Sequence, residues 1–199
     1  MKRITAILLA GIMVLSLSAC GKGSAADNNA SADSAEAEAE TEAQTGMANP
    51  WTDTTEDDAF AETAFLFTVP EGATDVTWRR MENGEYLLIE VDFTLGMYEF
   101  CARAQYGAAE DEDISGMYYE WSDSKDVTLA NWGGGNMPAT IKTGTDGEAT
   151  AFLCSWYDIE VGEAYTLSTT TQDDSELDMQ AVAESMFDET KVPGYNAPQ

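Results

Sequence analysis

Histidine is absent from this sequence of 199 residues. Without an imidazole there is no serine–histidine–aspartate triad, no cysteine–histidine pair and no histidine-based zinc site. Phosphate-binding loops are missing too, because the glycine run WGGGN at residues 132–136 lacks the G-x-G-x-x-G spacing and the lysine of a P-loop. We therefore expect no enzyme, no cofactor and no metal site, and we interpret the glycine run as a turn.

Basic residues are scarce: nine lysines and arginines stand against 37 aspartates and glutamates, a formal net charge of −28. A surface of this sign repels phosphate backbones, which excludes nucleic acid as a partner, and it also disfavours a domain lying flat on anionic lipid. The acidity has two interpretations. One is solubility through self-repulsion, and the other is the binding of a cation or a basic partner.

Long apolar runs are limited to one, at residues 4–17, directly after Lys2 and Arg3. A short positive segment followed by about 14 apolar residues is typical of a secretory signal peptide, and it is too short to span a bilayer comfortably. We therefore assign residues 1–19 to a signal peptide that is removed.

The signal peptide ends in Leu17-Ser18-Ala19-Cys20, which resembles the lipobox of bacterial lipoproteins. The resemblance implies cleavage after Ala19 and a diacylglycerol on Cys20, which would hold the protein on the extracytoplasmic face of the cell membrane by lipid alone. The alternative is an ordinary signal peptide cleaved near Ala19, with Cys20 incidental.

Residues 21–46 contain no valine, isoleucine, leucine, phenylalanine, tyrosine or tryptophan. Such a stretch cannot bury enough surface to offset the ordering of the chain. We interpret residues 20–46 as the lipidated cysteine and a disordered acidic tether, residues 47–190 as one globular domain, and residues 191–199 as a flexible tail.

The domain is predicted to be α+β. Thr55 is a helix cap followed by an acidic first turn, and Ser175 caps an apolar stripe typical of a second helix. Between them, stretches of period two give about seven short strands, and the Asn83-Gly84 pair is a hairpin signal. We expect a mainly antiparallel sheet with both helices packed on one face, from strand stretches at 65–69, 74–81, 85–94, 97–105, 126–130, 137–142, 149–157 and 164–170.

Four short motifs, NPW (49–51), VPEGATDV (69–76), DISGMYYEW (113–121) and AVAESM (181–186), resemble an uncharacterised extracytoplasmic domain. That domain occurs in Gram-positive lipoproteins and in the outer parts of anti-sigma-factor-like proteins. The resemblance implies an outward-facing domain and carries over no catalytic residue.

Candidate sites are few. Cys101 and Cys154 both lie in predicted strands and permit one disulfide, or they are two free thiols. The acidic loop Glu110–Asp113 offers carboxylates to Ca²⁺ without the order of an EF-hand loop, so simple solvation is the alternative. Trp121 and Trp132 are the tryptophans expected to be exposed, where they would form a platform for a ligand.

These observations predict a non-catalytic binding or sensing domain for a protein, peptide or glycan ligand at the cell surface. Two alternatives stay open. One is a small glycan hydrolase that uses a pair of carboxylates, and the other is a structural accessory subunit of an envelope complex.

The lipid anchor is directly testable. Mass spectrometry of the native protein should find a chain that begins at an acylated Cys20, and cells grown with labelled palmitate should label it. A Cys20→Ser variant should lose the label. An unmodified thiol at this position, or an intact first 19 residues, would contradict the anchor.

Overall fold

The computed structural model describes residues 49–145 and 147–194. The predicted signal peptide, the lipidated Cys20 and the whole predicted tether (20–46) therefore lie outside the described residues. Among the residues that are described, no helix has the length and apolar character needed to cross a membrane.

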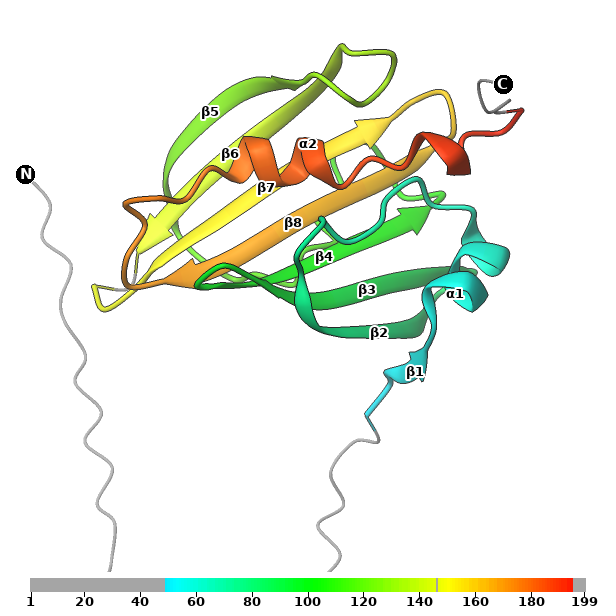
Figure 1. The fold of residues 1–199 in the computed structure, drawn as a ribbon, viewed down its shortest axis with the longest axis horizontal. Helices are drawn as coiled ribbons and strands as arrows, with labels where there is room; N and C mark the ends of the chain where they lie inside the picture. The colour runs from blue at the N-terminus through cyan, green and yellow to red at the C-terminus, as the bar shows by residue number, and fades with distance from the viewer. Residues whose placement is uncertain (1–48, 146, 195–199) are drawn as a thin grey trace, which may run out of the picture. The chain divides into compact units, whose positions relative to one another are not determined.

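The described chain folds into one eight-stranded antiparallel sheet with two α-helices (Figure 1). The order across the sheet is β1-β2-β3-β4-β8-β7-β6-β5. The elements in chain order are β1 (Thr52–Thr54), α1 (Glu56–Thr63), β2 (Thr74–Asn83), β3 (Tyr86–Leu95), β4 (Tyr98–Tyr106), β5 (Trp121–Leu129), β6 (Met137–Thr145), β7 (Thr150–Asp158), β8 (Glu163–Thr171), α2 (Met179–Ser185) and a short 3₁₀ turn, η1 (Glu189–Lys191).

Local sequence signals explain where α1 begins and where the chain turns between β2 and β3. Thr55 caps α1, since its Oγ1 accepts a hydrogen bond from the Asp58 N–H at 3.1 Å. The Asn83-Gly84 signal forms the predicted hairpin, in which Asn83 pairs with Tyr86 across the β2–β3 turn. Gly84 has a φ of 66°, a conformation that favours glycine. Both predictions are confirmed.

The main core lies on the sheet face that the helices cover. Ala59 of α1 and Ala183 of α2 belong to one buried cluster with the inward side chains of the strands. Trp132 is its largest buried side chain: its ring centroid lies 5.0 Å from those of Trp156 and Tyr165, and its Nε1 donates to the Ala183 carbonyl at 2.9 Å. Figure 1 shows α2 lying over β6 and β7.

The fold differs from the prediction in particular elements. Residues 65–69 do not form a strand of the sheet. Phe65 and Phe67 are buried on the covered face, and Phe67 makes an isolated bridge with Phe187. The sheet has eight strands rather than about seven, since β1 adds a strand of three residues that was not predicted. β5 is also longer than predicted and begins at Trp121 rather than at 126.

The C-terminal segment also differs from its prediction. Asp178, not Ser175, caps α2, and its carboxylate accepts from the Ala181 N–H at 3.0 Å. Lys191, assigned to a flexible tail, donates to Glu56 and to the Phe67 carbonyl, both at 2.6 Å. The chain is therefore held against the core one residue beyond the predicted end of the domain.

One buried carboxyl lies at the start of β8. Glu163 is 1% exposed, and its Oε2 accepts a hydrogen bond from the Tyr165 hydroxyl at 2.6 Å, while its Oε1 has no partner. The pKa of Glu163 is raised to about 7: burial raises it most, the Tyr165 hydrogen bond lowers it, and the charge of Asp158 raises it. This carboxyl shares the helix-covered face with Tyr165, since alternate residues of a strand point the same way.

Glu163 should make the stability of the protein depend on pH. The unfolded carboxyl titrates near 4.5 and the folded one near 7, so the folded state binds its proton more tightly. Its contribution to the free energy of unfolding should fall as the pH rises from about 4.5 to 7, by roughly 3 kcal/mol. Glu163→Gln should flatten that fall in denaturant unfolding measured at several pH values. The same substitution at the exposed Glu82 is the control, and equal pH profiles of wild type and Glu163→Gln would contradict the assignment.

Candidate functional site

The sheet face opposite the helices carries a continuous row of polar side chains. Successive strand pairings align Arg79, Glu90 and Arg103 on β2, β3 and β4, and the row continues through β8, β7, β6 and β5. Directly paired residues of neighbouring strands point to the same face. The remaining members of the row, in spatial order, are Thr166, Ser155, Thr140 and Asp126.

In the described part of the chain, residues 107–120 cross this open face. They join β4 in the middle of the sheet to β5 at its edge. Ala108 and Ile114 fasten the segment through a second small cluster of buried side chains that includes Leu88 and Ala164. Arg103 adds a hydrogen bond from its Nη1 to the Ile114 carbonyl at 2.9 Å. We call residues 107–120 the crossing segment.

The crossing segment needs a glycine where it passes Arg103. Gly116 has a φ of 69°, and a Cβ at this position would lie 2.4 Å from Arg103 Nη1. Only a residue without a side chain allows both the left-handed backbone and this close approach. The segment thereby lies against the row and leaves a hollow on each side.

The larger hollow has a volume of about 660 Å³ and reaches from β8 to the edge strand β5. Hydroxyl-bearing residues Thr140, Ser155 and Thr166 contribute to its floor, and residues 110–113 of the crossing segment form a wall. Five carboxylates and one ammonium group, Lys142, line it. We call this hollow the acidic groove.

The predicted acidic loop therefore forms a wall of a groove, and its carboxylates do not gather around one point. Glu112 Oε2 accepts from the Ala109 N–H at 3.1 Å, and Asp113 Oδ1 accepts from the Ser115 N–H at 2.9 Å. Among the residues that the structure describes, the loop is not part of any group of ligand atoms close enough to share a metal ion. The Ca²⁺ alternative gains no support.

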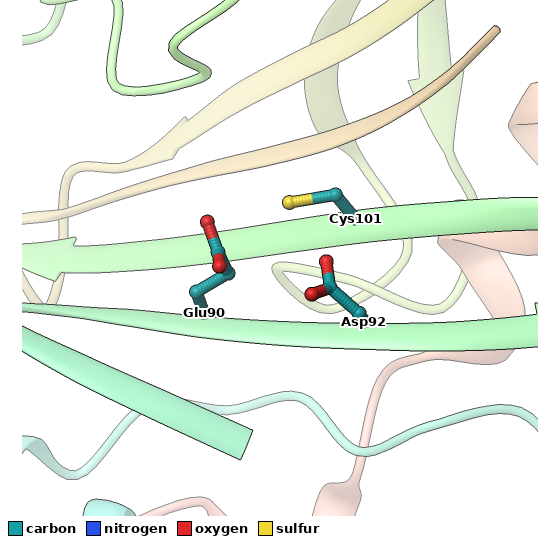
Figure 2. A group of neighbouring side chains, drawn as sticks. All are labelled: Glu90, Asp92 and Cys101. Carbon is teal, nitrogen blue, oxygen red and sulfur yellow. The ribbon is translucent and has the colours of Figure 1, made fainter. Parts of the chain in front are cut away.

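The smaller hollow, of about 420 Å³, lies on the other side of Met117 and is lined by Cys101 and Asp92. Figure 2 shows the side chains of Cys101, Asp92 and Glu90 pointing toward one another. One ligand atom from each lies within 4.8 Å of the others. By spacing alone, these three groups resemble part of a metal site.

The charges around the trio argue against a cation. Glu90 is buried between two arginines: Arg79 Nη2 lies 2.7 Å from its Oε1, and Arg103 Nε donates to its Oε2 at 2.7 Å. Arg79 also donates to Asp92, and the Trp51 ring packs against both guanidinium groups, at 5.9 and 5.3 Å. A metal ion would have to displace Arg79. Glu90 and Asp92 therefore form a balanced ion network with the two arginines rather than a metal centre.

The thiol of Cys101 is also unsuited to metal binding or nucleophilic attack. Burial raises its pKa well above the ordinary range, and the charges of Glu90 and Asp92 raise it further. For Cys154, burial alone raises the pKa to about 12. Both thiols therefore keep their protons at neutral pH.

The disulfide between Cys101 and Cys154 is not formed; both cysteines are free. Cys101 pairs with Ser168 and Cys154 pairs with Leu167, so strand β8 lies between them. Because neighbouring residues of a strand point to opposite faces, Cys101 lies on the open face and Cys154 on the covered one. A bridge would have to pass through the sheet, so of the two alternatives the structure has the second, two free thiols.

The tryptophan platform is wrong for Trp132, which is fully buried beneath α2. Its position beside glycines suggested exposure, but the glycine turn folds the ring inward onto the core. Trp121 is half-buried, and its ring centroid lies 5.9 Å from that of Tyr119. The two predicted ligand residues do not form a common site.

The floor of the acidic groove was missed by the sequence reasoning. Thr140, Ser155 and Thr166 are spread over 27 positions and are brought side by side only by strand pairing. The available signal was the alternation of small hydroxyl residues with apolar ones in the strands, which marks a polar face without showing which strands are neighbours.

No family model matches the chain, and no curated protein or solved structure matches it. The resemblance of its four short motifs to an extracytoplasmic domain thus stays a prediction.

The protected thiols lead to a measurable expectation. In a Cys20→Ser protein, Cys101 and Cys154 should react with a thiolate-selective disulfide reagent at pH 8 on the order of 10³-fold more slowly in the native than in the unfolded state, because the thiolate fraction is so small. Single Cys101→Ser and Cys154→Ser variants assign the slow phases. Rapid native labelling of Cys101, which is half-buried, would contradict its protonated state.

Proposed function

We propose that this protein is a lipid-anchored, extracytoplasmic binding protein whose domain holds a cationic ligand in the acidic groove without catalysing a reaction. The observation that supports this most directly is the lining of the groove. Five carboxylates against one lysine surround a hollow large enough for a small molecule or a peptide segment. A groove of this charge favours amines and guanidinium groups over anions.

The position of the groove supports the same proposal. It lies on the face that neither helix covers, and Glu110, Asp111, Glu112 and Asp113 are all exposed. Exposed carboxylates keep their water until a ligand arrives, so attraction to a single ammonium group is weak. Several charges acting on one multivalent ligand give a useful affinity that falls with ionic strength.

The domain as a whole adds a field of the same sign. Residues 47–199 carry 31 acidic and six basic side chains. This charge accelerates the approach of a basic ligand and discourages binding of anionic polymers. The predicted anchor on Cys20 would place this field outside the membrane, where ligands arrive from the surroundings.

The proposal is tested by titrating the purified protein with spermine, a linear polycation, in a calorimeter at low and at physiological ionic strength. Binding should be present at low salt and weaken as salt is added. A groove variant, Asp111→Asn with Asp126→Asn, should bind about five-fold more weakly or worse.

The matched control removes two charges of the same type outside the groove lining, Asp123→Asn with Asp174→Asn, and should stay within about two-fold of wild type. No binding of spermine at low salt, or equal losses in the groove variant and the control, would rule out the groove as a cation site.

A further inference from the structure

The outer edge of β5 is a nine-residue strand edge that no other described segment pairs with. β5 stands at the end of the sheet and, among the described strands, pairs only with β6, while Gln180 of α2 bonds the Thr128 carbonyl near its C-terminal end. At the other end of the sheet the edge strand is β1, which has only three residues and pairs with three residues of β2. A long open edge offers main-chain donors and acceptors in a regular row.

The register shows which β5 residues direct their backbone outward. Thr128 pairs with Pro138, and proline has no N–H, so this pair is a non-hydrogen-bonded one. The Thr128 N–H and C=O therefore face away from β6, and its carbonyl accepts a hydrogen bond from Gln180 Nε2 at 3.0 Å. With the period of two, Asp126 and Ser124 also direct their N–H and C=O groups outward.

The same two residues direct their side chains toward the open face. Asp126 lines the acidic groove and belongs to the polar row with Thr140 and Ser155. In a strand added at this edge, the residues bonded to Asp126 and Ser124 would project their side chains on that same face. Main-chain pairing and the groove thus act on one ligand: the edge binds its backbone and the groove binds every second side chain.

We propose that β5 takes up an extended basic peptide segment as a ninth strand, with alternate lysine or arginine side chains over the acidic groove. This inference rests on the proposed function and identifies the ligand class as peptide. Strand addition gives affinity through the backbone, and the side-chain groove gives specificity.

Charge decides between a peptide and a second copy of the chain as the occupant. Pairing two β5 edges would bring together two domains that each carry 31 acidic and six basic residues. On β5 itself two exposed carboxylates, Asp123 and Asp126, stand against one lysine, Lys125. Like charges across a strand pair are destabilising, whereas a basic segment gains from the same field.

The test uses an acetylated and amidated octapeptide of alternating lysine and threonine, titrated into the purified protein. Two modified versions carry the same charge and the same number of N-methyl groups. Methylation of the lysine amides blocks the bonds toward β5 and should weaken binding about ten-fold or more. Methylation of the threonine amides alters only the outer edge and should change the affinity by no more than about two- to three-fold.

Ser124→Pro tests the protein side of the same contact. It removes one outward N–H without touching the ladder to β6, so the variant should keep the wild-type melting temperature and spermine affinity but lose about five-fold or more in peptide affinity. Should this variant fold poorly, the paired N-methyl peptides still decide the question.

The outcomes separate the two proposals. Spermine binding with equal affinity for both methylated peptides would overturn strand addition and leave the cation groove intact. Absence of both spermine and peptide binding would overturn the proposed function itself. A dimer in sedimentation that Ser124→Pro dissociates would assign the edge to a second copy and overturn the peptide proposal.

Discussion

The strand order requires one long connection, from β4 to β5, and this connection shapes the open face of the sheet. β4 lies in the interior of the sheet and the next strand along the chain, β5, lies at its far edge. The chain has to pass over one face to join them, and the helices already occupy the other. Residues 107–120 therefore cross the polar face, fastened by Ile114 and by the guanidinium of Arg103. Both hollows of that face exist because this segment lies between them.

The two sides of that face differ in whether their charged side chains have partners of opposite sign. Glu90 is buried, but two arginines pair with its carboxylate and the Trp51 ring packs against Arg103. The charge of Glu90 is therefore balanced locally. On the other side of the crossing segment, the carboxylates of residues 110–113 are exposed and meet only one lysine in the groove. Arg103, paired with the buried Glu90, thus helps to hold the crossing segment in place, and the exposed carboxylates remain available to a ligand.

The sequence predicted a structural feature correctly where neighbouring residues alone determine it. The Thr55 cap and the Asn83-Gly84 hairpin depend on a few neighbouring residues, and both formed as expected. The strand expected at 97–105 also formed, as β4. Residues 65–69 misled the prediction because an apolar run of strand length satisfies either a sheet or a buried extended segment. Trp132 misled it because burial beneath α2 depends on a helix 47 residues further along the chain.

The sequence by itself determined the acidity of the chain, the absence of imidazole chemistry, the alternation of the strands and the places where the chain turns, since each of these depends on composition or on near neighbours. Only the tertiary structure decided that Cys101 and Cys154 lie on opposite faces, that Asp126 and residues 110–113 share a groove, and that β5 keeps an open edge. These facts depend on which strands are neighbours. Strand order is set by the packing of the whole core, so no short stretch of sequence encodes it.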